Sequence, residues 1–117
     1  MFHERRIPGH FVESGYDRQL ALDSVKCGWA HLINDLFDFI DTQNIKIKII
    51  QVKEKYGGLR IYTDVINESL DEKIIELERA SFKICEDCGL DGHLRGGSRY
   101  RTLCEEHANG QRAVREF

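Results

Sequence analysis

A chain of 117 residues, 41% of them hydrophobic, is long enough to bury one core and does not have the composition of a disordered protein. The net charge of −3 gives no general sign of a nucleic-acid or membrane partner, and no apolar run approaches the ~18 residues of a spanning helix. Because the first residues, MFHERRIPGHFVESG, lack the apolar region of a signal peptide, we expect a cytoplasmic protein that does not bind membranes.

Residues 1–17 contain the only proline and show no regular periodicity, so we expect an irregular lead-in. The first predicted helix begins near Gly28, since the segment GWAHLINDLFDFID repeats apolar residues at the spacing of one helical face. An extension back to Asp23 is disfavoured by Gly28, because glycine is a poor helix former. The helix is expected to end within residues 42–44, and its apolar stripe comprises Trp29, Leu32, Ile33, Leu36, Phe37 and Ile40.

Residues 45–49 alternate isoleucine with lysine, which predicts a half-buried strand. The alternation changes phase at Ile50, so we expect either a β-bulge near Ile49–Ile50 or a portion of strand that is buried on both faces. Gly57-Gly58 offers the positive-φ positions of a tight turn, and the segment LRIYTDV supplies the returning strand. Together these residues predict an antiparallel β-hairpin.

A second helix is predicted over residues 67–82, where Ser69 and Glu72 have the spacing of a capping box. A segment rich in cysteine follows it. The order helix, hairpin, helix and cysteine segment predicts an α+β fold. We expect a single domain over residues 1–117, made of the lead-in 1–17, an α/β/α body 18–82 and a zinc-binding subdomain 83–117.

Three of the four cysteines lie in the segment CEDCGLDGHLRGGSRYRTLCEEH. Cys85 and Cys88 are three residues apart, with two residues between them, and are followed by a glycine, which is the pattern of a zinc knuckle. Cys104 and His107 repeat this separation after a spacer of 15 residues. Two ligand pairs at these spacings predict a closed Cys3His site for one structural zinc ion.

The spacer between the two pairs predicts how they are brought together. Its glycines favour a β-hairpin, and Thr102 with Glu105 has the spacing of a capping box. We therefore expect a helix that carries Cys104 and His107 on one face, three residues apart. Knuckle, hairpin and helix together make a treble-clef-like arrangement.

Other roles for the cysteines fit the sequence less well. A redox pair of the thioredoxin type would lie in a βαβ unit, and a reducing cytosol disfavours a disulfide. A catalytic zinc ion keeps one coordination position open, whereas four ligands are present here. His93 is an alternative to His107 as the fourth ligand, although it lacks a paired spacing. Cys27 is expected to be a buried free thiol in or near the first helix.

Two glycine-containing segments carry cations beside tyrosines. In HLRGGSRYR, the arginines could hold phosphates while Tyr100 stacks on a base, or they could pair with nearby carboxylates at a solvated hairpin tip. In KEKYGGLR, Lys55 and Tyr56 offer a similar contact, although turn formation and protection of a strand edge also explain these residues. The candidate partner-binding residues are Arg95, Arg99, Tyr100, Arg101, Lys55 and Tyr56.

Catalytic groups are not indicated by the sequence. The five histidines are scattered, and no pair of nucleophile and base can be placed. The segment LCEEHANG is similar to the end of HNH nucleases, but the Asp-His element with a following proline that those nucleases carry has no counterpart in this chain. We therefore expect a protein that is not an enzyme.

The segments GWAHLINDLFDFI, QVKEKYGGLRIY and CEDCGLDGHLRGGSRYRTLCEEHA resemble a group of small bacterial and prophage-encoded zinc-binding proteins. Members share a GW-initiated helix, a QVKEKxGGLR hairpin and a C-terminal CxxCG…LCxxHA segment, and the resemblance covers roughly residues 27–108. It implies a phage or mobile-element context and carries metal ligation onto Cys85, Cys88, Cys104 and His107.

Small proteins in that context often act by binding host proteins. We therefore expect a non-enzymatic, zinc-stabilised module that binds, and thereby inhibits, a host or defence protein. One alternative is a nucleic-acid-binding protein that uses the basic hairpin at residues 95–101. Another is a structural domain that acts as a homo-oligomer.

Overall fold

The structure is a computed structural model that describes residues 14–97 and 99–108. The predicted α+β class is confirmed, as is the order of helix, hairpin, helix and cysteine segment. The lead-in predicted for residues 1–17 and the end of the subdomain predicted for residues 83–117 lie partly outside the described residues. The elements are α1 Arg18–Asp23, the 3-10 helix η1 Cys27–Trp29, α2 Ala30–Gln43, β1 Ile49–Lys55, β2 Gly58–Thr63, α3 Glu68–Ser81, β3 His93–Arg95, β4 Arg101–Leu103 and α4 Glu105–Ala108.

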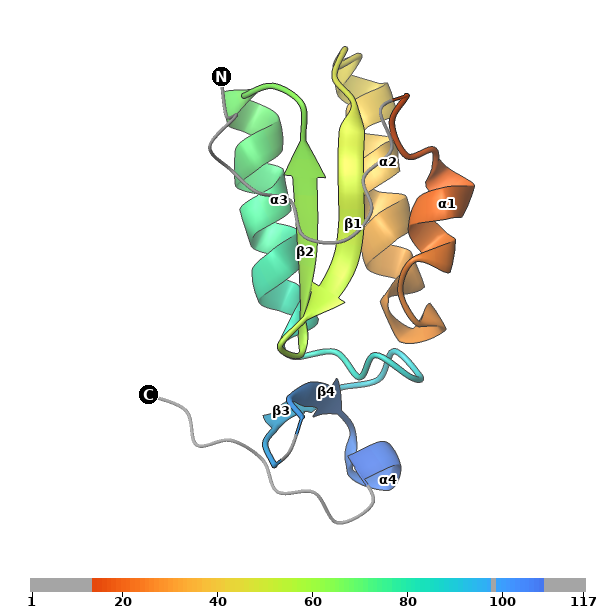
Figure 1. The fold of residues 1–117 in the computed structure, drawn as a ribbon, viewed down its shortest axis with the longest axis vertical. Helices are drawn as coiled ribbons and strands as arrows, with labels where there is room; N and C mark the ends of the chain where they lie inside the picture. The colour runs from red at the N-terminus through yellow and green to blue at the C-terminus, as the bar shows by residue number, and fades with distance from the viewer. Residues whose placement is uncertain (1–13, 98, 109–117) are drawn as a thin grey trace.

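The body of the molecule is a β1–β2 hairpin with α2 and α3 packed on one of its two faces (Figure 1). The short helix α1 lies against α2, and the cysteine segment with β3, β4 and α4 follows beyond the turn of the hairpin (Figure 1). Side chains from both helices and both strands meet between these layers and form the core, in which Trp29, Leu36, Leu59, Leu70 and Leu77 are buried. Among the described residues, no helix combines the length and the apolar character needed to cross a bilayer.

The helix predicted from Gly28 onward is η1 followed by α2, and a short helix that was not predicted, α1, precedes it. α1 is a separate helix whose N-terminus is capped by Asp17, which accepts a hydrogen bond from the Leu20 N–H at 2.8 Å. α2 ends at a left-handed Asn44, and the N–H of Ile45 bonds back to the Ile40 carbonyl at 3.0 Å. This C-terminal cap occupies the first residues of the stretch predicted as a strand. The prediction that residues 45–48 are part of the strand is therefore wrong, and β1 begins at Ile49.

The β1–β2 hairpin contains the predicted bulge, because the register of the two strands shifts between Ile49 and Gln51. The predicted turn is displaced by one residue. Tyr56 and Gly57 hold the positive φ angles, 54° and 86°, and Gly58 is already part of β2. Gly58 has a different role, since a Cβ atom there would collide with the ring of Phe82, which would have to move.

α3 has the predicted extent, but its N-terminal cap is Asn67 rather than Ser69. The Asn67 side chain accepts a hydrogen bond from the Leu70 N–H at 3.0 Å. The Ser69 hydroxyl donates to the same Asn67 oxygen at 3.1 Å instead of capping the helix itself. An amide oxygen two residues earlier therefore takes the role that the capping-box spacing had assigned to serine.

Side chains of α3 also satisfy the outer edge of β2. The N–H of Leu59 donates to the Ser81 hydroxyl at 2.9 Å, and the N–H of Ile61 donates to the Glu78 carboxylate at 2.9 Å. A two-stranded sheet is marginal by itself, and unpaired edge groups favour pairing with other chains. The helix thus supplies the hydrogen bonds that a third strand would have made.

Replacing Glu78 by glutamine is predicted to change how stability depends on pH. Burial raises the pKa of the Glu78 carboxyl, and the hydrogen bond from Ile61 opposes this only in part. Because the folded-state pKa lies above the unfolded value, the folded state binds more protons. The free energy of unfolding therefore falls as the pH rises from about 4.3 through the folded pKa. Glutamine can still accept the Ile61 hydrogen bond but does not titrate, so this part of the decline should disappear in Glu78→Gln.

Urea unfolding from about pH 4 to about pH 8 measures this difference. Glu72→Gln is the control, because Glu72 is an exposed residue of the same helix. An identical pH dependence of stability in the wild type and in Glu78→Gln would show that Glu78 does not have a raised pKa in the folded protein.

Candidate metal centre

The first ligand pair lies on a tight turn at the end of the body. Gly89 has a φ of +84°, as expected for the glycine of a zinc knuckle, and its N–H bonds to the Cys85 carbonyl at 2.8 Å. Cys85 is fully buried, whereas Cys88 is exposed. The turn therefore directs two thiols to one point, with one sulfur on the inner side and the other towards solvent.

The second pair is presented by β4 and α4. Cys104 directly precedes α4, and His107 lies in that helix. The predicted hairpin is confirmed as β3–β4, but Thr102 does not cap the helix. It lies in β4, and its hydroxyl donates to the Gly57 carbonyl at 2.7 Å. The helix starts two residues later than the capping-box spacing had indicated, because Thr102 is engaged by the β1–β2 turn.

The four predicted ligands converge, with their ligand atoms all within 4.8 Å of one another. His107 Nδ1 lies 3.2 Å from Cys104 Sγ and 3.6 Å from Cys85 Sγ, and the Cys88 and Cys104 sulfurs are 3.8 Å apart. A tetrahedral zinc ion with Zn–S bonds of about 2.3 Å and Zn–N bonds of about 2.0 Å would separate its ligands by roughly 3.5–3.8 Å. The separations of 3.2–4.8 Å are close to these values, so the four side chains could bind one metal ion after small shifts of the side chains.

Protonation in this cluster depends on its internal hydrogen bonds. Burial opposes ionisation of Cys85, but backbone N–H groups of Cys104, Cys88 and Asp87 lower the pKa of the Cys85 thiol to about 7. The Leu90 N–H favours the Cys88 thiolate, but desolvation and the neighbouring Cys85 and Cys104 thiols oppose it and together raise the pKa of Cys88 to about 11. Three thiols this close cannot all become thiolates without a compensating positive charge. A divalent cation would supply the charge that allows it, and its binding would release protons.

The other cysteine and the alternative histidine lie outside the cluster. His93 is exposed in β3 and does not belong to the group of four. Cys27 is exposed, so the prediction of a buried thiol is wrong. Its sulfur lies 3.4 Å from the carbonyl of Asp87, in the knuckle, because the segment before α2 packs against this turn. No disulfide joins any cysteines of the described chain.

Gly28 attaches the knuckle to the body. Its N–H donates to the Glu86 carbonyl at 2.8 Å, and a Cβ atom at this position would collide with the Cys85 and Glu86 carbonyl groups. The next residue, Trp29, is buried, and its indole N–H donates to the Ile84 carbonyl at 2.9 Å. The GW dipeptide at the start of the predicted helix thus allows two backbone segments to approach closely. Sequence reasoning had treated Gly28 only as a helix boundary.

A second attachment joins the cysteine segment, residues 84–108, to the β1–β2 turn. The Thr102 hydroxyl bonds to the turn, as described above, and the Thr102 N–H donates to the buried Glu86 carboxylate at 3.2 Å. Arg101 lies 3.6 Å from Glu86 and 3.0 Å from Asp87. The ligand-bearing turn, β4 and the body are therefore held by a shared network of hydrogen bonds and ion pairs.

The candidate partner-binding residues divide into two groups. Arg95 is only 4% exposed, and its Nε donates to the Leu103 carbonyl at 3.1 Å, so the prediction that it is an exposed contact is wrong. Its side chain helps to fill the interior of a very small subdomain. Arg101 is engaged by Glu86 and Asp87. The exposed candidates are Arg99, which lies 3.6 Å from Glu54, together with Tyr100 and Tyr56, while Lys55 is half-buried.

The arrangement is chemically suited to one closed metal site that holds the C-terminal segment together. Three thiols and one imidazole are soft and intermediate donors, the set typical of structural zinc. Comparison of the chain with protein-family models, with curated proteins and with solved structures finds no match.

Proposed function

We propose that the protein is a non-enzymatic binding module that is stabilised by one structural zinc ion and binds a protein partner. The closed Cys3His cluster carries this proposal, because four protein ligands leave no position for a substrate or a reactive water. Outside the cluster, no hydrogen bond between side chains of residues 14–97 and 99–108 joins a nucleophile to a histidine. These features support a structural role for the metal.

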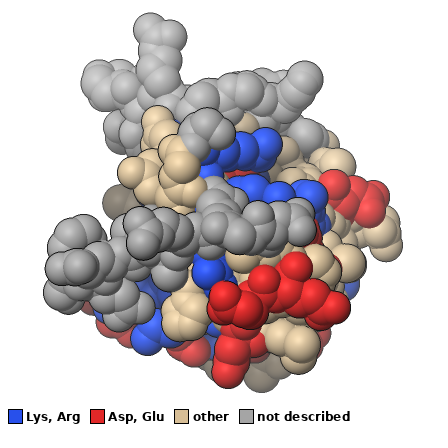
Figure 2. All heavy atoms as spheres, turned by 90° about the horizontal axis from the view of Figure 1, so that it is seen from below, with Lys and Arg blue, Asp and Glu red and all other residues tan. Residues whose placement is uncertain are grey.

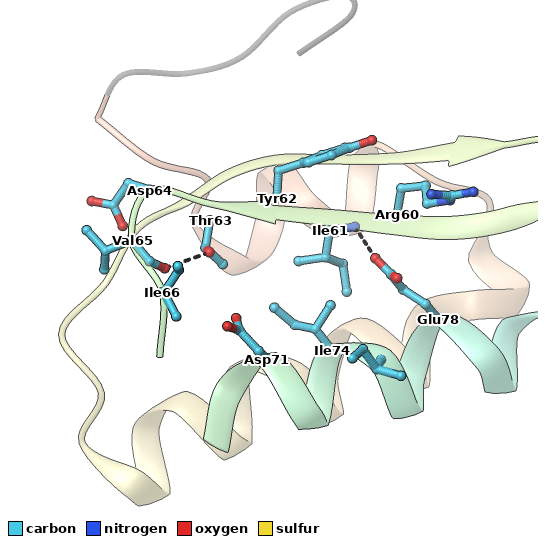
Figure 3. Close-up of a pocket in the computed structure, with 11 residues that line it drawn as sticks. Arg60, Ile61, Tyr62, Thr63, Asp64, Val65, Ile66, Asp71, Ile74 and Glu78 are labelled. Atoms are coloured by element: carbon cyan, nitrogen blue, oxygen red, sulfur yellow. Dashed lines mark hydrogen bonds between the residues drawn. The ribbon is translucent and has the colours of Figure 1, made fainter. Parts of the chain in front are cut away.

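A groove between β2 and α3 is the surface that best suits a protein partner. It has a volume of about 770 Å³, and Figure 3 shows Ile61 and Thr63 of the strand directed towards Asp71 and Ile74 of the helix. Its rim carries exposed aliphatic side chains, at Val65, Ile66 and Ile75, and Ile66 is 89% exposed. Large exposed aliphatic residues that gather at one hollow mark an interaction site.

The groove favours an amphipathic helix as the occupant. Addition of a strand to β2 is blocked at Leu59 and Ile61, whose N–H groups already bond to Ser81 and Glu78. Recognition must therefore use side chains, as when an apolar helix face enters a groove. The carboxylates that line the groove, Asp64, Asp71 and Glu78, outnumber its one cation, Arg60, which favours a partner helix that carries Lys or Arg beside its aliphatic residues.

The resemblance of three segments to prophage-encoded proteins supports a bacterial host or defence protein as the source of that helix. The partner would be inhibited because its helix is held in the groove.

The proposal is tested by comparing capture from bacterial lysate, with nuclease present, by wild type, Ile66→Asp and Leu90→Asp. Leu90 is the matched control, since it is an exposed aliphatic residue of the zinc-binding segment and does not line the groove. We expect one stoichiometric protein that Leu90→Asp retains and Ile66→Asp loses, and a synthetic helix from it should show the same pattern. Equal capture of this protein by the wild type and by both variants would show that the groove is not the binding site. Turnover by the metal-loaded protein, such as Mg²⁺-dependent nicking of plasmid, would overturn the non-enzymatic assignment.

A further inference from the structure

The β1–β2 hairpin has a second face, opposite the helices, on which basic side chains gather. Cross-strand partners share a face of a sheet, and so do residues two apart on one strand. Val52 pairs with Ile61, and both are buried in the core. Lys53 pairs directly with Arg60, one residue along on each strand, so these two point away from the core, and Lys55 is on the same face as Lys53.

This group of cations is not explained by the stability of the fold. Like charges that are directly opposite on an antiparallel pair destabilise it. The pKa of Lys53 is lowered, first by partial burial and then by the charges of Lys55 and Arg60. None of the ion pairs formed among the described residues includes one of these three cations. The intervening Glu54 is engaged by the Gly57 N–H and by Arg99. The charge of Arg60 also acts on the Glu78 carboxyl to lower its pKa, but the two form no ion pair, so this face of the hairpin keeps a local excess of positive charge.

Aromatic rings adjoin the cations. Tyr62 is two residues from Arg60 and so belongs to the same face of β2. Tyr56, at the turn, is 67% exposed, and the Lys55 ammonium lies 5.7 Å from the centre of its ring. Cations beside an exposed ring are a combination that suits single-stranded nucleic acid, since the cations contact phosphates and the ring stacks on an unpaired base.

We propose that the basic face of the hairpin, formed by Lys53, Lys55, Arg60 and Tyr56, binds the phosphate backbone of single-stranded nucleic acid without regard to sequence. An acidic protein would also be attracted by the cations, but it would make no use of an exposed ring beside them. A duplex would leave the Tyr56 ring without a base to stack on, because its bases are already paired and stacked.

The site differs from the basic hairpin at residues 95–101 that the sequence indicated, because Arg95 and Arg101 are occupied within the fold. The view from the metal-binding end shows clusters of basic side chains beside acidic ones (Figure 2). Since the whole chain has a net charge of −3, attraction to a polyanion must be local.

The test uses the metal-loaded full chain and a fluorescein-labelled oligothymidine of about 15 nucleotides, with binding followed by fluorescence anisotropy. Between about 50 and about 200 mM salt, three cation–phosphate contacts predict a log–log slope of about −2, and Lys53→Gln should reduce its magnitude by about 0.7. Tyr56→Ala should weaken binding about fivefold or more, through loss of one stacked base. Lys46→Gln is the control, because Lys46 is exposed and lies before β1.

Lys53→Gln removes a like-charge contact, so its urea midpoint should not fall, and weaker binding will not reflect loss of the fold. Absence of binding at low salt by the folded protein would overturn the proposal. Equal competition by poly-glutamate, or equal affinity for a duplex of the same length, would overturn the assignment to single-stranded nucleic acid. The inference goes beyond the proposed function and is separable from it, since Ile66→Asp should leave oligothymidine binding unchanged.

Discussion

Removal of the metal by excess chelator is expected to unfold residues 84–108 and to lower the stability of the remaining body. The apparent binding free energy of a structural zinc ion in a small zinc-binding segment is about 10–16 kcal/mol near pH 7, and this energy is folding energy. Within residues 84–97 and 99–108 there is little other core, because the buried hydrophobic cluster there consists of Cys85, Leu103 and Ala108. Heteronuclear NMR should show collapse of the amide dispersion of this segment, with partial recovery when Zn²⁺ is restored.

Two variants separate loss of the metal from nonspecific effects of the chelator. Cys104→Ser removes a ligand and should reproduce the change without chelator. His93→Ala removes an exposed histidine of the same subdomain and should keep one equivalent of metal. Full retention of the folded spectrum after complete removal of metal would show that the cluster is not a structural metal site.

Gly28→Ala is expected to detach the knuckle from the body. The added Cβ atom would meet the backbone carbonyls of Cys85 and Glu86, and backbone cannot move aside as a flexible side chain can. Overpacking of a close contact typically costs about 1–3 kcal/mol, and this case should reach at least the upper part of that range. The Trp29 indole N–H should lose its bond to Ile84, which would move its NMR resonance towards that of a solvent-exposed indole.

Cys27→Ala is the matched control, because it introduces the same side chain at the adjacent residue. It removes an exposed thiol and one weak contact to Asp87, so its effect on stability should stay below about 1 kcal/mol. Similar urea midpoints for the two variants would contradict the close contact at Gly28.

Periodicity and spacing predicted the parts of the fold that depend on local sequence. α3 matches its apolar stripe nearly to the residue, and the phase change at Ile50 correctly indicated a bulge. The errors arose where one element competes with the next for the same residues. The C-terminal cap of α2 takes Ile45 out of the strand, and the side chain of Asn67 takes the capping role from Ser69. Such competition depends on hydrogen bonds that a pattern of apolar residues does not encode.

The metal cluster could be predicted because ligand spacing is a local property of a knuckle and a helix start. The partner-binding candidates could not be sorted in the same way. Arg95 and Arg101 differ from Arg99 only in what surrounds them, and the carbonyl and carboxylates they meet come from other segments. Gly28 and Thr102 gain their roles from contacts with residues 45 or more positions away.

The hydrogen bonds between α3 and the edge of β2 have a consequence for the order of folding. Contacts within the hairpin can form early, since the two strands are adjacent in sequence, but the amides of Leu59 and Ile61 have no partner until α3 arrives. Their exchange with solvent deuterium therefore reports the separation of helix from sheet, not the opening of the hairpin itself. In the native state these two amides should exchange together with the core of α3, as members of one cooperative unit.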